Sequence, residues 1–254
     1  MAVHLIHVSK AGGTALRFAI RASRVTSGGR LKTPWGEVWG HDHRFTLSDV
    51  PREDVAFFAL RDPISRFLSG YYSRLRKGAP RYFVEWTDAE ARAFKWFPTP
   101  QELADALAEP SGKPRRRAEF AMKSIRHVKR PLTFWTGKPS YLRKHIDKVI
   151  YIARQETLDE DWEKLKELLG LPSDQMLPKD DTYAHRTVYA ADDDRTLSGK
   201  GEDALRAWYA DDYKLIEIAE ELRSGELQRS GSLLDRLVPL ERIPGVAALR
   251  RAAR

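Results

Sequence analysis

The chain has 254 residues and no cysteine, so its length suits one α/β domain, and a disulfide framework, a thiolate metal site and a cysteine nucleophile are excluded. No apolar run approaches the roughly 18 residues of a membrane span and no signal-peptide pattern opens the sequence, so we expect a soluble cytoplasmic protein without a transmembrane span. The formal net charge of +8 favours anionic ligands without choosing among nucleotides, nucleic acids and acidic polysaccharides.

Residues 3–24 (VHLIHVSKAGGTALRFAIRASR) predict a strand, a tight turn and a helix in succession. The branched apolar residues of 3–8 are typical of a buried strand, and the apolar residues after Thr14 recur at helical spacing. In the turn, Gly12 and Gly13 allow backbone N–H groups to approach an anion at a helix N-terminus, and Lys10 adds a mobile positive charge. The turn therefore predicts an anion-binding loop.

Two well-known phosphate loops do not fit this turn. A nucleoside-triphosphatase loop has its lysine after the glycines, in the pattern G-x-x-x-x-G-K-[ST], whereas Lys10 precedes the glycine pair. A dinucleotide-binding loop has G-x-G-x-x-G and an acidic residue about twenty positions later, and neither is present. A plain strand–turn–helix, whose glycines only shape the turn, is the alternative that remains.

Residues 30–51 are predicted to consist largely of loops, and they carry the cluster W-G-H-D-H-R-F at 39–45. His41 and His43 flank Asp42 in this cluster, but two imidazoles and one carboxylate without a further ligand group do not make a metal site. We therefore predict no metal. Surface histidines in a polar loop are the alternative to a catalytic role.

The apolar residues 55–60 (VAFFAL) predict a central parallel strand that leads directly into a helix. Arg61 then lies at the carboxyl end of the strand and Ser69 two turns into the helix. Because ligands of open α/β sheets bind beyond the carboxyl ends of the strands, the Lys10 turn and Arg61 are expected to face one crevice. Arg66 is interpreted either as a further ligand or as part of the solvated helix face.

Both segments resemble binding motifs of sulfotransferases that use 3′-phosphoadenosine 5′-phosphosulfate (PAPS). The turn resembles the 5′-phosphosulfate loop H-x-P-K-x-G-G-T-[ST]-L, with Ser9 in place of the proline and Ala15 in place of the second hydroxyl residue. Residues 61–72 resemble the family's 3′-phosphate motif R-D-P-x-x-R-x-x-S-x-Y-Y, whose arginine and serine hold the phosphate. The resemblance implies the cofactor-binding residues Lys10, Ala11, Gly12, Gly13, Thr14, Arg61 and Ser69.

The histidine cluster resembles the Gly-His that precedes the same strand in carbohydrate sulfotransferases of the heparan and dermatan 2-O type, although Trp39 replaces the companion histidine of the heparan enzymes. The resemblance implies that His41 is the general base, with His43 as the reserve candidate. It also implies in-line transfer to an acceptor hydroxyl without a metal, with Lys10 neutralising the charge that grows on the leaving oxygen.

The middle of the chain is predicted to face the acceptor. Residues 78–97 form a charged, aromatic-rich insert, and the basic residues of 113–130 predict either a contact with a polyanionic acceptor or a solvated helix surface. No nucleic-acid-binding module is recognisable, so we do not expect nucleic acid as a partner. Residues 132–137 resemble the family segment near the adenine, which implies that Trp135 lines the cofactor pocket.

The remaining elements are expected to complete the fold. Residues 149–153 predict a third strand, followed by a helix that ends at Gly170, and residues 202–223 predict one long amphipathic helix. Residues 179–187 resemble the family loop that closes over the cofactor. Helix N-caps are expected at Asp62, Thr99 and Thr157, the last two with the capping-box pattern.

These features predict a three-layer α/β protein with a mostly parallel central sheet flanked by helices, the P-loop-like fold of sulfotransferases. Residues 1–224 are expected to form one domain, followed by a basic tail at 225–254 that is helical or flexible. The expected activity is transfer of the sulfuryl group of PAPS to a hydroxyl acceptor, a carbohydrate, glycolipid or small metabolite, with the 3′,5′-bisphosphate PAP as product. A kinase-like phosphotransferase and a non-catalytic nucleotide-binding protein are the alternatives.

Overall fold

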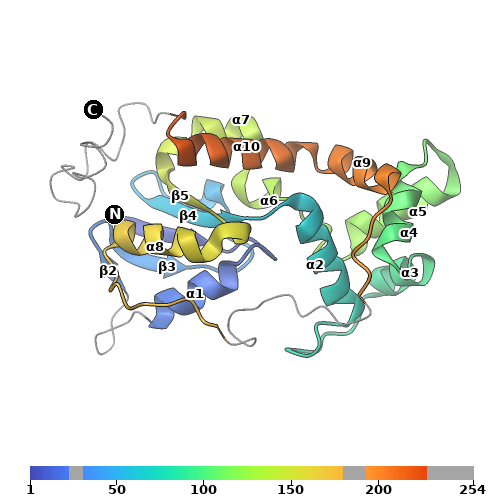
Figure 1. The fold of residues 1–254 in the computed structure, drawn as a ribbon, viewed down its shortest axis with the longest axis horizontal. Coiled ribbons are helices and arrows are strands. Elements are labelled where there is room, and N and C mark those ends of the chain that lie inside the picture. The colour runs from blue at the N-terminus through green and yellow to red at the C-terminus, as the bar shows by residue number, and fades with distance from the viewer. Residues whose placement is uncertain (23–30, 180–192, 228–254) are drawn as a thin grey trace.

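A five-stranded sheet with the order β2-β3-β1-β4-β5 lies at the centre of the computed structural model, which describes residues 1–22, 31–179 and 193–227 (Figure 1). Four strands are parallel: β1 (Ala2–Ile6), β3 (Gly36–Gly40), β4 (Val55–Leu60) and β5 (Val149–Arg154). The short β2 (Lys32–Thr33) pairs antiparallel with β3. Every residue of β4 is buried, as expected for a strand covered on both faces. The predicted mostly parallel sheet is confirmed.

Helices cover both faces of this sheet and give the molecule three layers (Figure 1). On one face lie α1 (Gly13–Ala22) and α8 (Leu158–Leu169), and on the other lie α6 (Thr133–Thr136), α7 (Pro139–Lys144) and α10 (Ala210–Ser224). Side chains alternate along each strand, so Leu5 and Phe57 pack with α1 and α8, whereas Ile6 and Phe58 pack with the opposite helices. The predicted three-layer architecture is confirmed.

A third hydrophobic core lies beside the sheet. We call it the helical lobe, and it contains α2 (Pro63–Leu75), α3 (Asp88–Trp96), α4 (Pro100–Ala108), α5 (Gly112–Ser124) and α9 (Gly199–Trp208). Short 3-10 helices are found at η1 (Leu47–Asp49), η2 (Ile146–Lys148) and η3 (Gln155–Thr157). Because α2 begins directly after β4, the lobe joins the sheet at the strand end that carries Arg61.

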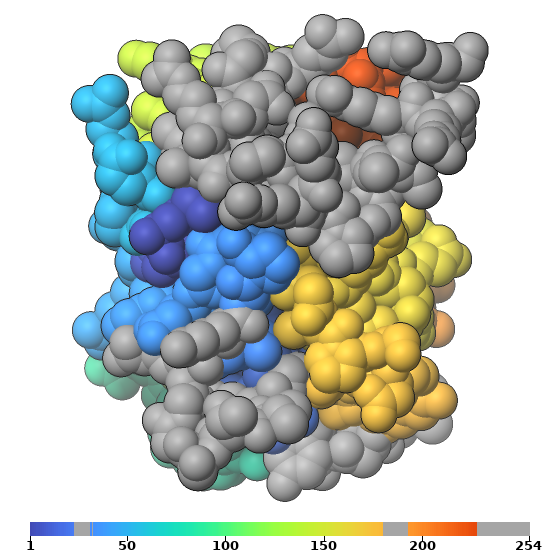
Figure 2. Space-filling model, turned by 90° about the vertical axis from the view of Figure 1, so that its left-hand side faces the viewer, coloured from blue at the N-terminus to red at the C-terminus, as the bar shows by residue number. Residues whose placement is uncertain are grey.

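The segment 30–51, predicted to consist largely of loops, also contains two strands that were not predicted, β2 and β3. In β3 only Val38 is buried, so the segment lacks the apolar run that identifies a central strand. Trp35, between the two strands, holds them against α8 by donating from Nε1 to the carbonyl oxygen of Leu168 at 2.8 Å. Figure 2 shows this side of the molecule, with the β2–β3 segment in blue beside α8 in yellow.

The single long helix predicted for residues 202–223 is divided at Tyr209 into α9 and α10. Leu205 and Tyr209 are buried in the helical lobe, whereas Leu215 and Ile218 are buried against the sheet. The chain therefore passes from one core to another at Tyr209.

Two predicted caps are present, since Asp62 and Thr99 each accept a backbone hydrogen bond at the start of a helix. The capping box predicted at Thr157 is wrong, because the Thr157 hydroxyl donates to the Asp161 carboxylate at 3.0 Å instead of accepting a helix amide. Asp161 is fully buried, so its carboxylate needs several donors, and the threonine supplies one. The helix ends as predicted at Gly170, which has φ 63°.

Two predictions fall on residues outside the described part of the chain: the loop at 179–187, of which only Lys179 is described, and most of the tail at 225–254. The last described helix, α10, is followed by Gly225 in the left-handed conformation with φ 81°. Across the three described ranges, no helix is long and apolar enough to cross a membrane.

Candidate active site

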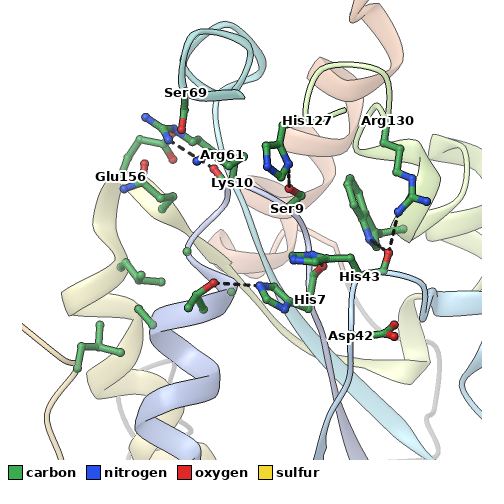
Figure 3. A pocket seen from close by; sticks show the side chains of 18 of the residues that line it. His7, Ser9, Lys10, Asp42, His43, Arg61, Ser69, His127, Arg130 and Glu156 are labelled. Carbon is green, nitrogen blue, oxygen red and sulfur yellow. Dashed lines mark hydrogen bonds between the residues drawn. The ribbon is translucent and has the colours of Figure 1, made fainter. Parts of the chain in front are cut away.

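A cavity of about 1110 Å³ lies at the carboxyl ends of β1 and β4 (Figure 3). Its walls come from the turn at residues 9–14, called the cradle below, the loop after β3, the β4–α2 junction, the loop after α5 and the start of α8. Ala11 is buried in the core beneath the cradle, and His41 lies outside the lining. The other residues predicted for the site all line the cavity: Lys10, Gly12, Gly13, Thr14, His43, Arg61, Ser69 and Trp135.

The two glycines of the cradle are required by close packing. Gly12 has φ 88°, and a Cβ atom there would lie 2.8 Å from Cδ2 of Leu158. A Cβ atom at Gly13 would lie 2.5 Å from Cδ2 of His7, whose Nε2 is 3.2 Å from Thr14 Oγ1. The glycines thus bring the N-terminus of α1, with the amide donors of its first turn, to the wall of the cavity.

Lys10 occupies the cradle with φ 64° and lines the cavity. Burial lowers its pKa to about 7, and the positive charges of Arg81, Arg61 and Arg76 contribute to this shift. The ammonium group therefore lies in a cluster of like charges. A multiply charged anion in the cavity would stabilise all of them.

Arg61 reaches the same cavity from the end of β4. Its Nη1 donates to the carbonyl oxygen of Lys10 at 3.4 Å, and its buried Nε has no hydrogen-bond partner within the described residues. Ser69 is fully buried on α2 and lines the cavity near it (Figure 3). A buried guanidinium N–H without an acceptor is unfavourable, and a phosphate oxygen would satisfy it. The residues present therefore fit a phosphate-bearing ligand.

His43 lies across the cavity from Lys10 and Arg61 (Figure 3). Its backbone carbonyl oxygen accepts hydrogen bonds from Trp135 Nε1 at 3.1 Å and from Arg130 Nη1 at 3.2 Å. Trp135, expected to lie near an adenine, thus contacts the histidine loop.

The protonation state of His43 follows from its ring contacts. The ring lies 3.9 Å from that of His7, centroid to centroid, and Nδ1 is 3.1 Å from the His7 carbonyl oxygen. Since a carbonyl only accepts, Nδ1 carries the proton, and Nε2 of the neutral ring is an acceptor. Although part of the residue is exposed, partial burial of the ring lowers its pKa, so the neutral form prevails at pH 7.

His41 belongs to a different cluster. Its Nε2 lies 2.8 Å from Nδ1 of His4, and Nε2 of His4 lies 3.1 Å from the Asp54 carboxylate. The Asp54 carboxylate accepts from Nε2 of His4, and the single hydrogen bond between His4 Nδ1 and His41 Nε2 links the two imidazoles. The His41 ring also stacks on Phe45 at 3.5 Å. Burial, together with the neighbouring His4, lowers the pKa of His41 to about 4.

The interpretation of Arg66 as part of a solvated helix face is wrong, because the residue is only 1 % exposed. Its Nε donates to the carbonyl oxygen of Ser9 at 2.9 Å, and its Nη2 donates to that of Arg130 at 2.6 Å. The guanidinium group also lies over the Trp135 ring, 5.3 Å from its centroid. The apolar periodicity of α2 gave no signal for this burial.

Two further histidines of the cavity wall, His7 and His127, were not predicted. His7 matches the histidine that begins the motif H-x-P-K-x-G-G-T-[ST]-L, and this match is the signal that could have identified it. His127 lies between two hydroxyl groups, with Nδ1 3.1 Å from Ser9 Oγ and Nε2 3.1 Å from the Tyr82 hydroxyl oxygen. Burial lowers the pKa of His127 well below its ordinary value, so this ring is neutral. No local motif links residues so far apart in the sequence.

The basic residues of the middle segment divide into two groups. Arg126, Lys129 and Arg130 follow α5 and line the cavity. The basic run at 113–117 lies within α5 and outside the lining, where Arg115 pairs with the next helical turn. The first group is therefore placed to meet a ligand in the cavity, and the second forms helix surface.

Comparison with known proteins identifies the family. A model described as the sulfotransferase family matches residues 42–220, which include His43, Arg61, Ser69 and Trp135. No match is found among curated proteins or among solved structures. Within the described part of the chain, no group of three or more His, Cys, Asp or Glu side chains is arranged to hold a metal ion. Because the family model matches more than half of the chain, the protein belongs to the sulfotransferase family.

Proposed function

We propose that this sulfotransferase transfers the sulfuryl group of PAPS to a hydroxyl group of a carbohydrate or glycolipid, with His43 as the general base. One observation carries the proposal: the cradle with Lys10, the pair Arg61 and Ser69, and His43 come from separate elements and line one cavity. The acceptor class is supported by the resemblance of residues 39–45 to carbohydrate sulfotransferases and by the basic residues that follow α5.

The donor site has two parts that suit the two ends of a 3′,5′-substituted nucleotide. Lys10 and the amides at the start of α1 are suited to the 5′-phosphosulfate, whereas Arg61 Nε and the Ser69 hydroxyl are suited to the 3′-phosphate. When bound, PAPS supplies the sulfuryl group. Lys10 opposes the negative charge that grows at the 5′-phosphate during transfer, and an anion beside it raises its pKa so that it stays charged.

His43 is favoured over His41 as the base by position and by protonation. His43 lines the cavity with Nε2 available to accept a proton from an acceptor hydroxyl, and its backbone is fixed by Trp135 and Arg130. His41 uses its Nε2 in the hydrogen bond with His4 and lies outside the cavity lining. This exchanges the roles that the sequence resemblance implied.

The test is transfer of labelled sulfate from PAPS to a panel of carbohydrate acceptors by the parent protein, His43→Ala and His41→Ala, at matched donor saturation. We expect His43→Ala to lose transfer by roughly a hundred- to ten-thousand-fold, with PAP affinity nearly unchanged. His41→Ala should lose much less. Near-parental rates in both variants would exclude a histidine base from this cluster.

The two alternative functions can be distinguished from sulfuryl transfer by the donor that is used and by the need for a metal ion. A phosphotransferase should move phosphate from ATP and stop when EDTA removes Mg²⁺. A binding protein without catalysis should be stabilised by PAP in a thermal-shift assay and should transfer sulfate to no acceptor. The sulfotransferase should be stabilised more by PAP than by AMP and should remain active in EDTA.

A further inference from the structure

Arg66 is a fully buried cation on α2 that no proposed binding role explains. Within the described residues its hydrogen-bond acceptors are the two backbone carbonyl oxygens of Ser9 and Arg130. A carbonyl compensates less than a carboxylate for removing a guanidinium group from water. The buried carboxylate of Asp212 partly offsets the cost of burying this charge, while the two carbonyl hydrogen bonds fix the orientation of the guanidinium group.

The two carbonyl oxygens belong to two segments of the cavity wall that are far apart in the sequence, the cradle and the loop after α5. Ser9 immediately precedes Lys10 in the cradle, so Nε of Arg66 fixes the backbone at the donor side. Arg130 lies in the other segment, and its own Nη1 donates to the His43 carbonyl oxygen at 3.2 Å. Figure 3 shows Lys10 and Arg130 on separate segments of the cavity wall, with Ser9 and His127 between them.

A second connection runs through the tryptophan. The guanidinium group of Arg66 lies 5.3 Å from the centroid of the Trp135 ring, and Trp135 Nε1 donates to the same His43 carbonyl oxygen at 3.1 Å. Both donors to the His43 backbone are therefore in contact with Arg66. Arg66 therefore contacts the cradle directly, and it is connected to His43 through Arg130 and Trp135.

From this geometry we propose that Arg66 is a positioning residue that fixes the distance between the donor cradle and His43. The inference rests on the proposed function, because it concerns the same cavity. Only a planar fork can donate in two directions while stacking on an indole, so lysine cannot replace arginine here. A misplacement of the reacting groups by about 1 Å can cost roughly a hundredfold in rate.

The test is a double-mutant cycle with labelled PAPS that compares the parent, Arg66→Lys, His43→Ala and the double variant. We expect Arg66→Lys to lower kcat roughly a hundredfold in the parent but by about twofold at most when His43 is absent. PAP affinity, measured by calorimetry, should change much less than kcat. A merely structural role predicts equal losses in both backgrounds, and that result would overturn the inference.

Tyr71→Phe is the matched control on α2, since it removes a buried hydrogen bond to the Phe97 carbonyl oxygen away from the cavity and should leave kcat unchanged. If Arg66→Lys does not fold, Arg130→Met replaces it in the same double-mutant cycle. This variant keeps the Arg130 carbonyl oxygen that accepts from Arg66, and it removes the Arg130 side-chain donor to the His43 carbonyl oxygen. The same comparison of losses in kcat with and without His43 then applies. A parent protein that transfers no sulfate would overturn the proposed function and the inference together. An active parent with additive losses overturns the inference alone.

Discussion

Replacing Lys10 with methionine should make the ligand-free protein more stable while it removes activity. The ordinary lysine pKa of 10.5 is lowered to about 7 at this position, so the charged form is disfavoured in the folded state. At about 1.4 kcal/mol per pKa unit, this shift corresponds to a destabilisation of the folded state by at most about 5 kcal/mol. Solvent screening makes the actual destabilisation smaller, because Lys10 is partly exposed.

The sign follows from proton binding. Between pH 7 and 10.5 the unfolded chain keeps the Lys10 proton and the folded chain has lost it, so the Lys10 contribution to stability rises with pH by at most about 1.4 kcal/mol per pH unit. Below pH 7 both states are protonated and the full destabilisation is present. The difference in free energy of unfolding between Lys10→Met and the parent should therefore be largest below pH 7 and shrink between pH 7 and 9.

Urea denaturation of both proteins at pH 6, 7, 8 and 9 measures this difference. Lys77→Met is the control, because Lys77 also has a positive φ, 56°, but its amino group pairs with Glu85 at 2.8 Å. A difference that stays constant across this pH range would refute the assignment of Lys10 to a buried cluster of like charges. A gain in stability with parental turnover would refute its role in transfer.

Three further outcomes are expected. Arg61→Ala should weaken PAP binding roughly tenfold to a hundredfold and AMP binding far less, because only PAP carries the 3′-phosphate, and equal losses in calorimetry would contradict the assignment. Gly13→Ala should lower both Tm and PAP affinity, since its Cβ would lie 2.5 Å from the His7 ring, whereas Gly199→Ala, with open space around it, should change neither. The free energy of unfolding of the parent should fall as the pH falls from 6.5 to 4, because His41 is protonated in the unfolded chain over this range, whereas the folded ring, with a pKa of about 4, stays neutral. If His41→Leu lost as much stability as the parent over the same range in acid denaturation, this expectation would be contradicted.

The central strands and the cradle side of the cavity could be predicted because each is a contiguous signal. β4 is a continuous apolar run, and Arg61 follows it directly, so parallel pairing with β1 brings Arg61 to the cradle. β3 could not be predicted, since only Val38 in it is buried. Arg66 escaped prediction because its acceptors are backbone carbonyl oxygens, which leave no trace in residue type.

The placement of the two histidines depends on where β3 ends. The His41 amide still donates to the carbonyl oxygen of Leu5 at 3.3 Å, so His41 remains in the sheet and its ring stacks beside that of His4 on the neighbouring strand. The turn that begins at Asp42 then carries His43 to the cavity. The residue at which β3 gives way to the following turn decides which imidazole faces the cavity, and neither spacing nor composition encodes it.

Different parts of the cavity wall are carried by different hydrophobic cores. Acceptor preference and transfer chemistry could therefore be changed independently by protein engineering. The cradle and His43 are carried by the sheet, whereas Tyr82, Val84 and Lys129 come from connections between helices around the lobe. Tyr82 is linked to the cradle through His127 and Ser9, so a library that varies only Val84 and Lys129 would alter one wall and leave the cradle untouched. New acceptor preferences could then be selected without rebuilding the transfer chemistry.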